Sequence, residues 1–310
     1  MAITRLKTTS HEDWLKLRHK YIGGSDAAAV VGLNPWVSRY SLWAEKTGRL
    51  PSFQGNLATE VGTYLEEFVA KKYEHETGKK VRRVNQSILN SDFPFAIANI
   101  DREIVGEDAG LEIKTTSELN LKKFKGGEYP ALYYCQCVHY MAITGKKRWY
   151  LAVLIGNREF KWFVIERDES EIDALMETES EFYEYIKNNT PPPVDGSQAT
   201  TNAIKAIYTD SDDGYSVEIY DKTDLEQYIQ LSNKIKELEK IRDEHTNKIK
   251  LYMEEAEMAE SEKYTVFWKS SIRRTFDIKR FISEHPEIDF TEYYKDANTR
   301  TFRVLEKKGV

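Results

Sequence analysis

Cysteine is scarce in this sequence of 310 residues: only two are present, Cys135 and Cys137, with one residue between them. Two cysteines at this spacing cannot build the disulfide framework of a small secreted domain. They also exclude an iron–sulfur cluster of the kind held by four cysteine thiolates. We therefore expect both thiols to act as small, buried apolar side chains.

Long apolar runs are missing as well. No stretch approaches the roughly 20 apolar residues of a membrane-spanning helix, and the first residues, MAITRLKTTSHEDW, lack the apolar block of a signal peptide. Hydrophobic residues make up 40% of the chain and charged residues 31%, which is the balance of a soluble protein. The composition predicts a cytoplasmic protein with no membrane partner and with enough residues for one large or two smaller domains.

An excess of positive charge, the usual mark of a nucleic-acid-binding protein, is absent, because the formal net charge is −6. Net charge is an average, however, and a local basic groove can exist on an acidic protein. Lysine and arginine gather in three runs, within 71–83, 122–125 and 146–148. Each run alone is typical of a solvated face, but together the three bracket the candidate site described next.

The most informative stretch runs from Asp101 to Lys114. Apolar residues flank a turn rich in glycine and acidic residues, GEDAG at 106–110, which is the chemistry of a hairpin. Side chains alternate along a strand, so Glu112 and Lys114 share one face, and pairing brings Asp101 beside them. Two carboxylates and an ammonium in a small volume suit a hard cation such as Mg²⁺ with a bound water. The alternative is a surface hairpin with one salt bridge.

Three further features favour a site over a surface salt bridge. The strands around Asp101 and Glu112 are otherwise apolar, where a charge without a partner would be costly. Gln136 and Tyr140 are four residues apart on a helix predicted over about 130–143, so they share a face. Glu66 lies on a helix predicted over 56–77. Purely structural alternatives stay open for two of these residues: a core position for Tyr140 and a solvated helix carboxylate for Glu66.

Paired glycines near the N-terminus form a candidate anion site. The sequence predicts a helix over 10–17 that ends at Arg18, then a turn from Tyr21 to Ser25 that opens a second helix over 26–31. Glycines leave backbone N–H groups accessible, and Ser25 can cap the helix. A helix start with a hydroxyl and a nearby arginine can bind an anion. The alternative is ordinary capping with Arg18 solvated.

The chain changes character after a helix predicted over 171–187. A rigid proline stretch at 191–193 follows, and we place a domain boundary near residue 195, giving domains 1–195 and 196–310. Apolar residues three and four apart predict a long helix over 224–259, with a coiled-coil seam within the chain or between subunits. Short strands are predicted over 263–274 and 300–305, in a basic subdomain that either contacts DNA or is simply solvated. Its basic residues are Lys269, Arg273, Arg274, Arg300 and Arg303, interleaved with Trp268 and Phe276.

The hairpin and the helix after it resemble a known family. Asp101 followed by Glu112-x-Lys114 resembles the core of PD-(D/E)xK nucleases, although Ile100 stands where the motif is named for proline. Gln136-x-x-x-Tyr140 resembles the additional motif of the RecB-like and lambda-exonuclease-like branch. The segment WLKLRHKYIGGSDAAAVVGLNPW is similar to the opening of YqaJ-type phage recombination nucleases, and the motifs occur in the expected order over about 14–168. The resemblance implies an α/β fold, a central mixed sheet flanked by helices, followed by a C-terminal extension.

The resemblance also implies roles for the hairpin residues. Asp101 and Glu112 would hold Mg²⁺, or Mn²⁺ in its place, with the Ile113 carbonyl, and Glu66 would join them directly or through water. Lys114 would orient the attacking water and stabilise charge on the scissile phosphate.

Outside the hairpin, the resemblance assigns contacts with DNA. Gln136 would touch a phosphate or the attacking water, and Tyr140 would brace DNA or the glutamine. Arg18 and Ser25 would bind a terminal 5′ phosphate. Asn99 stands where the family has a third phosphate-contacting serine, which is a departure from the pattern.

Together these roles imply a Mg²⁺-dependent exonuclease without an iron–sulfur cluster, which acts on ends of double-stranded DNA in the 5′ to 3′ direction. The partner implied is a RecT-like annealing protein that coats the 3′ overhang, and the assembly implied is a homo-oligomer, a trimer by resemblance. The setting implied is the cytoplasm of a bacterial host of a phage or prophage. Two other functions stay open: an endonuclease on the same core, and a DNA-binding or oligomeric scaffold that does not cleave.

Overall fold

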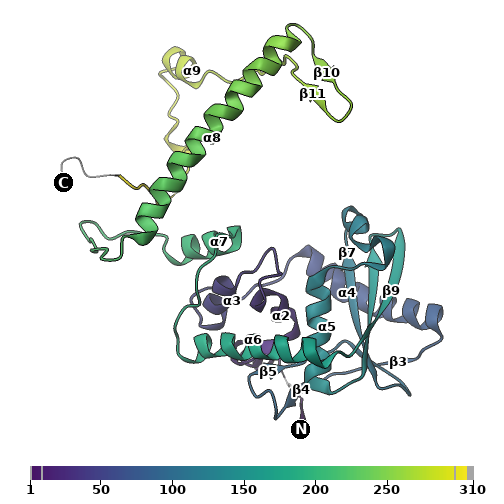
Figure 1. The fold of residues 1–310 in the computed structure, drawn as a ribbon. Helices are drawn as coiled ribbons and strands as arrows, with labels where there is room; N and C mark the ends of the chain where they lie inside the picture. The colour runs from purple at the N-terminus through teal and green to yellow at the C-terminus, as the bar shows by residue number, and fades with distance from the viewer. Residues whose placement is uncertain (1, 8–9, 297, 306–310) are drawn as a thin grey trace. The chain divides into compact units, whose positions relative to one another are not determined.

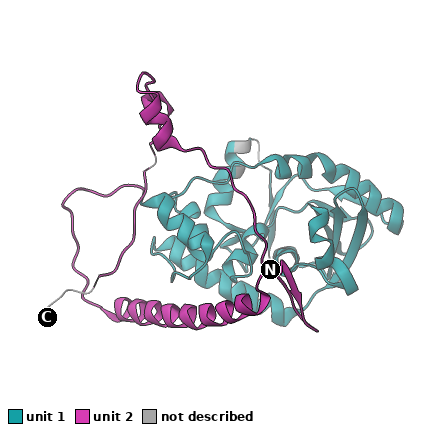
Figure 2. Cartoon of the chain, turned by 90° about the horizontal axis from the view of Figure 1, so that it is seen from above, with its two compact units in different colours: residues 1–208 teal, residues 209–310 magenta. Residues whose placement is uncertain are grey.

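The computed structural model describes residues 2–7, 10–296 and 298–305 and divides into two compact units. Figure 1 shows the order of the elements, and Figure 2 colours the units separately, residues 1–208 and 209–310. Within the described ranges, no helix is long and apolar enough to cross a membrane. The first unit contains every residue predicted for the catalytic site, so its architecture decides what these residues can do.

A five-stranded mixed sheet forms the centre of the first unit (Figure 1). Its strands, in spatial order, are β3 (Val81–Arg83), β6 (Arg102–Ile104), β7 (Ala109–Thr116), β8 (Arg148–Ile155) and β9 (Glu159–Glu166). β7 and β8 pair in parallel, and the other neighbours are antiparallel. The predicted hairpin is therefore β6–β7, and the predicted α/β fold with a mixed sheet is confirmed.

Helices cover both faces of this sheet. The helices of this unit are α1 (His11–Lys20), α2 (Gly24–Val30), α3 (Arg39–Lys46), α4 (Leu57–Thr77), α5 (Ala131–Thr144), α6 (Glu169–Lys187) and α7 (Gln198–Ile207), with a 3-10 segment η1 (Glu118–Gly127). Leu111 and Ile113 pack with the α4 side chains Val69 and Tyr73 on one face. The cluster that contains α2, α5 and α6 covers the other. Since side chains alternate along β7, Glu112 and Lys114 project toward the α5 face.

Two small strand pairs connect the N-terminal segments to the core. β1 (Ile3–Leu6) pairs antiparallel with β4 (Ser87–Asn90), and β2 (Ile22–Gly23) pairs in parallel with β5 (Ala96–Ile97). The second pair matters for the site, because it sets Gly23, the residue that precedes α2, beside Ile97. From Ile97 the chain runs through three residues, 98–100, to Asp101 and the hairpin.

The first unit extends to Tyr208, beyond the boundary expected near residue 195. The reason is α7, which packs on α3 after the proline stretch. Thr200 of α7 is buried and donates a hydrogen bond from its hydroxyl to the Ser38 hydroxyl at the start of α3, at 2.7 Å. The proline stretch at 191–193 therefore lies within the first unit.

The second unit consists of α8 (Thr223–Met253), a hairpin of β10 (Met258–Glu260) and β11 (Thr265–Phe267), α9 (Ile278–Glu284) and η2 (Thr291–Tyr293). The long helix predicted to 259 ends earlier, at Met253, because Glu254 takes a positive φ of 46° and residues 258–260 pair as a strand. The strand predicted over 300–305 is wrong, since these residues form none, and only 265–267 of the stretch 263–274 is a strand.

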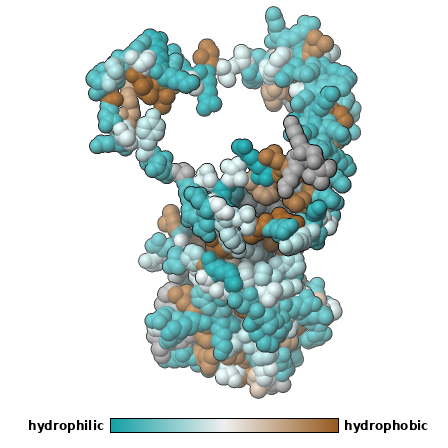
Figure 3. Space-filling model, turned by 90° about the vertical axis from the view of Figure 1, so that its left-hand side faces the viewer, coloured by the Kyte–Doolittle hydropathy of each residue, from teal (hydrophilic) through white to brown (hydrophobic). Residues whose placement is uncertain are grey.

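The apolar stripe of α8 is exposed. Leu231, Ile235 and Leu238 are each more than half exposed, and Tyr228 contacts the ring of Phe302 with centroids 5.6 Å apart. Figure 3 shows apolar side chains on the surface among the polar ones. A coiled-coil seam on α8 therefore stays a prediction.

Candidate active site

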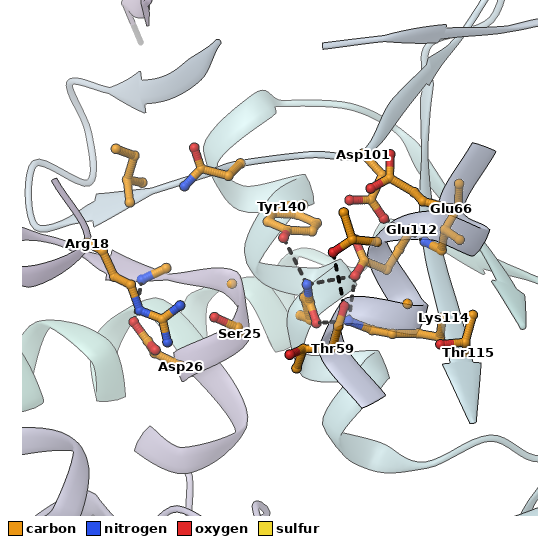
Figure 4. Close-up of a pocket in the computed structure, with 18 of the residues that line it drawn as sticks. Arg18, Ser25, Asp26, Thr59, Glu66, Asp101, Glu112, Lys114, Thr115 and Tyr140 are labelled. Carbon is orange, nitrogen blue, oxygen red and sulfur yellow. Dashed lines mark hydrogen bonds and ion pairs between the residues drawn. The ribbon is translucent and has the colours of Figure 1, made fainter. Parts of the chain in front are cut away.

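The residues singled out in the sequence line one pocket of about 500 Å³ (Figure 4). Arg18 and Ser25 lie at one end, with Asp26 beside them, and the carboxylates and the lysine lie at the other. The pocket is lined by all of the predicted site residues: Arg18, Ser25, Glu66, Asp101, Glu112, Ile113, Lys114, Gln136 and Tyr140. Asn99 lines it too. Segments separated by more than a hundred residues in the sequence thus converge on a single volume.

The hairpin places the two carboxylates and the lysine as the alternation predicted. The Ile113 backbone N–H donates to Asp101 Oδ2 at 2.8 Å, which fixes that carboxylate against β7. Lys114 Nζ lies 2.6 Å from Glu112 Oε1. Glu112 is only 2% exposed, so its charge is held inside the protein by this ammonium. The surface-hairpin alternative is thereby excluded.

Helix α5 supplies a glutamine that connects these groups. Gln136 Nε2 donates to Glu112 Oε1 at 2.8 Å and to the Tyr140 hydroxyl at 2.9 Å, while Lys114 Nζ donates to Gln136 Oε1 at 2.8 Å. Gln136 and Tyr140 share a helix face, as their spacing predicted, and both are buried. The amide thus fixes the position of the ammonium and of one carboxylate oxygen at once.

Burial and like charge shift the pKa values of this cluster. Burial and the neighbouring Glu112 raise the pKa of Asp101 well above its usual range. Burial would lower the pKa of Lys114, but the Glu112 and Asp101 carboxylates outweigh it and raise that pKa. Burial, with Glu112 and Asp101, also raises the pKa of Tyr140, so its phenol keeps its proton. Two carboxylates in this space therefore need positive charge beside them.

Glu66 is engaged by arginines in this structure. Its Oε1 accepts from Arg102 Nη1 at 2.5 Å and from Arg83 Nη2 at 3.2 Å. Arg102 is buried and also donates to the Asp101 backbone carbonyl and to Glu67. Among the described side chains, no three histidine, cysteine, aspartate or glutamate residues form a preassembled metal cluster. Glu66 is thus an ion-paired pocket residue, not the solvated helix carboxylate of the alternative interpretation.

The N-terminal end of the pocket differs in detail from the prediction. Helix α1 continues to Lys20, so Arg18 lies in its last turn, and α2 begins at Gly24. Ser25 does not cap α2. The Asp26 carboxylate accepts from the Gly23 N–H at 2.9 Å instead, which leaves the Ser25 hydroxyl at the pocket wall. Gly24 is needed here because a Cβ would lie 2.5 Å from the Tyr140 ring.

Most of the basic side chains in the first and third runs pair with carboxylates. Lys79 lies 2.7 Å from Glu107, and Arg82 and Lys146 both approach Glu103, at 2.7 and 3.7 Å. Lysines 122, 123 and 125, on η1, are exposed. The runs therefore contribute less free positive charge than the sequence indicated.

Sequence reasoning missed Asp26, Lys46 and Arg102. The signal for Asp26 was its place three residues after Gly23, the spacing of a capping carboxylate. Arg102 directly follows Asp101, but its alternating position placed it on the opposite strand face. Lys46 had no signal, because a lysine at the end of a helix is usually solvated.

Comparison with known proteins places the chain in a family. Residues 13–147 match the YqaJ-like viral recombinase domain. The uncharacterized protein YqaJ of Bacillus subtilis (strain 168) is 36% identical over 303 residues, which cover 96% of this chain and 95% of that protein.

Solved structures of LHK-Exo, an alkaline exonuclease from Laribacter hongkongensis, are similar in fold. The complex of LHK-Exo with dAMP is 25% identical, with a TM-score of 0.50, and the match covers 57% of this chain and 93% of that one. A second LHK-Exo structure is 24% identical with a TM-score of 0.49, over the same shares of the two chains. The resemblance read from the N-terminal segment and the hairpin is confirmed, and the chain belongs to the YqaJ-like viral recombinase family.

Proposed function

We propose that the chain is a deoxyribonuclease of DNA recombination, an exonuclease that uses Mg²⁺ to degrade one strand of a duplex from its 5′ end and leaves a 3′ overhang. The observation that carries this proposal is the single pocket lined both by the carboxylate–lysine cluster and by Arg18 and Ser25. The similar fold of LHK-Exo, an alkaline exonuclease crystallised with dAMP, supports the reaction class.

The carboxylates fit a divalent ion. Glu112 Oε2 is buried and has no hydrogen-bond partner among the described residues, and Asp101 is half-buried next to it with a raised pKa. A hard cation would satisfy the free oxygen and offset the like charges. Asp101, Glu112 and the Ile113 carbonyl would hold Mg²⁺ or Mn²⁺, with Glu66 directly or through water. Bound there, the ion would polarise the scissile phosphate and lower the pKa of a bound water.

The other side chains position the reacting groups. Arg18 and Ser25 bind the terminal 5′ phosphate, which places the next phosphate at the carboxylates. Lys114 directs the attacking water and stabilises the charge that grows on the phosphate oxygens. Gln136 holds Lys114 and Glu112 at hydrogen-bond distance, and Tyr140 holds the glutamine.

The bond made and the bond broken define the products. Water adds to phosphorus as the bond from phosphorus to one bridging sugar oxygen breaks, and that oxygen takes a proton. When the 3′ oxygen leaves, a mononucleotide is released and the shortened strand carries a new 5′ phosphate. The same anion-binding end of the pocket can then serve every cycle.

Three substrates test the proposal in one experiment with Mg²⁺: a linear duplex with 5′ phosphates, the same duplex with 5′ hydroxyls, and a covalently closed circle. We expect fast release of mononucleotides from the first, slow release from the second and no cleavage of the third. Cleavage of the circle would support an endonuclease on this core instead, an alternative that Asn99 in place of serine keeps open. No cleavage of any substrate would support a non-cleaving DNA-binding or oligomeric scaffold.

Partners and assembly belong to the same proposal. A long 3′ overhang is the substrate of a single-strand annealing protein, so we propose a RecT-like partner in the cytoplasm of a bacterial host. Following the resemblance, we propose a homo-oligomer, a trimer, whose mass light scattering can measure. The exposed stripe on α8 offers a further surface for association between copies.

A further inference from the structure

A buried ion pair lies beneath the anion-binding end of the pocket. Asp26, in the first turn of α2, and Lys46, the last residue of α3, are separated by 2.6 Å between Oδ2 and Nζ, and their side chains are 6% and 1% exposed. Removing a charge from water is costly for each of the two ions. Solubility explains charged residues on a protein surface, but it does not explain a buried pair in this position.

The other hydrogen bonds of Lys46 indicate what the pair does. Its ammonium donates to the backbone carbonyls of Arg18 and Tyr21, at 2.5 and 2.9 Å. An ammonium has three hydrogens, so these two carbonyls and Asp26 use all of them. Arg18 lies in the last turn of α1, and Tyr21 is the residue at which that helix ends. Lys46 thus fixes the C-terminal end of α1 through its backbone carbonyls.

Asp26 fixes the other partner. Its Oδ2 accepts the Gly23 N–H at 2.9 Å in addition to Lys46, which sets the first turn of α2. Ser25 lies between these two residues in the sequence and on the pocket wall. Figure 4 shows Asp26 next to Arg18 and Ser25. One buried pair therefore connects the backbone that carries Arg18 to the turn that carries Ser25.

We propose that Lys46 is a positioning residue that sets the separation of the Arg18 guanidinium from the Ser25 hydroxyl, and with it the preference for a phosphorylated 5′ end. This inference rests on the proposed function of the same pocket. A 5′ phosphate needs the Arg18 guanidinium and the Ser25 hydroxyl at a fixed distance from each other. A 5′ hydroxyl carries no charge and does not need both of these donors. Loss of the Asp26–Lys46 pair should therefore weaken the binding of phosphorylated ends selectively.

Binding without cleavage tests this directly. The probes are two oligonucleotide duplexes with a fluorophore at the 3′ end, one with a 5′ phosphate and one with a 5′ hydroxyl. Anisotropy titrations in the absence of divalent ions give both affinities for the full chain. For the wild type we expect the phosphorylated probe to bind at least tenfold more tightly. For Lys46→Met we expect this ratio to fall below threefold, with the affinity for the hydroxyl probe within twofold of wild type.

The matched control is Lys16→Met, because Lys16 is an exposed lysine on α1 that pairs with Glu12 four residues away. Its ratio should equal that of the wild type. A general structural effect of Lys46→Met would weaken both probes equally, and that outcome overturns the inference, as does an unchanged ratio. If Lys46→Met does not fold, Lys46→Met/Asp26→Asn carries the same test, because it leaves no buried charge without a partner.

The positioning role of Lys46 and the exonuclease activity of the chain are tested by different measurements. A wild type with no preference for the phosphorylated probe overturns the role of Lys46 together with the assignment of Arg18 and Ser25. Whether the chain is an exonuclease is decided independently by mononucleotide release from linear duplex in Mg²⁺. Retained exonuclease activity with unchanged end preference in Lys46→Met would remove only the positioning role.

Discussion

A buried pair of His139 and Glu179 gives a sharp prediction about stability. His139, on α5, and Glu179, on α6, are both fully buried, and His139 Nδ1 lies 2.9 Å from Glu179 Oε1. His139 Nε2 lies 3.0 Å from the carbonyl oxygen of Ile97. Both ring nitrogens therefore face acceptors, which is the pattern of a doubly protonated imidazolium. The pair fixes α5, the helix of Gln136 and Tyr140, to α6 and β5.

We expect Glu179→Gln to lower the free energy of unfolding by about 3–5 kcal/mol, the cost of leaving one partner of a buried ion pair. That is a large share of the roughly 5–15 kcal/mol that stabilises a typical domain. Glu177→Gln is the matched control, since Glu177 is exposed on the same helix, and it should change stability by less than about 0.5 kcal/mol. Urea denaturation followed by tryptophan fluorescence measures both, because the first unit contains five of the six tryptophans.

The pH dependence gives a second, independent check. Burial would lower the pKa of His139, but the Glu179 carboxylate and the Ile97 carbonyl outweigh it and raise the pKa above its usual value. A raised histidine pKa stabilises the fold fully below the unfolded value of about 6.5, and this contribution is lost as pH rises through the folded pKa. The stability gap between wild type and Glu179→Gln should therefore narrow from pH 6 to pH 9.

Two results would refute this reasoning. The first is a Glu179→Gln variant that unfolds at the same urea concentration as Glu177→Gln, and the second is a stability gap that widens with pH. The double variant His139→Gln/Glu179→Gln should be less destabilised than the sum of the single changes, with a coupling of about 0.5–3 kcal/mol. Additive single changes would mean that the two side chains do not act as a pair.

Three further predictions concern the active site and the second unit. Lys114→Met should reduce the single-turnover rate of linear duplex cleavage about 100- to 1,000-fold, with DNA affinity within threefold of wild type. Lys122→Met, at an exposed lysine, should change neither the cleavage rate nor the DNA affinity. Equal cleavage rates for the two variants would exclude the catalytic role of Lys114. Gly24→Ala should lower the cleavage rate more than Gly23→Ala. A Cβ at Gly24 would lie 2.5 Å from the Tyr140 ring, whereas a Cβ at Gly23 would lie 3.6 Å from Asp26 Oδ2. Equal cleavage rates for the two variants would show that the position of the Tyr140 ring is unimportant for cleavage. Glu254→Gly should stabilise the second unit by about 1 kcal/mol in thermal unfolding, since φ at Glu254 is +46°, while Glu255→Gly should not.

The sequence predicted the catalytic half of the site because local rules decide it. Alternation along β7 alone placed Glu112 and Lys114 on one face, and helical spacing alone placed Gln136 and Tyr140 on another. The turn at 106–110 then fixed the pairing that brings Asp101 to Ile113. No long-range information was needed beyond the hairpin and one covering helix.

The sequence failed where contacts with another element compete with the pattern of a single helix. The apolar spacing of α8 continues to Ala259, yet pairing of residues 258–260 with β11 ends the helix at Met253. Ser25 has the composition of a helix cap, but Asp26 takes that role because Lys46, twenty residues later, holds its carboxylate in place. In both cases the deciding partner lies outside the helix whose end it sets, β11 for α8 and Lys46 for α2, so periodicity and capping rules within that helix cannot identify it.

Glu66 differs from the other two carboxylates in how firmly it is held. Asp101 is fixed by a backbone N–H and Glu112 by Gln136 and Lys114, whereas Glu66 is held by arginine side chains. If Glu66 moved toward an ion, Arg102 would keep the Asp101 carbonyl at 2.9 Å and Glu67 at 3.1 Å, so its buried charge would retain acceptors. Release of Glu66 should thus cost less than displacement of Asp101. We therefore expect Glu66→Gln to weaken Mn²⁺ binding in calorimetric titration by less than tenfold and Asp101→Asn by more than a hundredfold; the reverse order would mean that Glu66 anchors the ion.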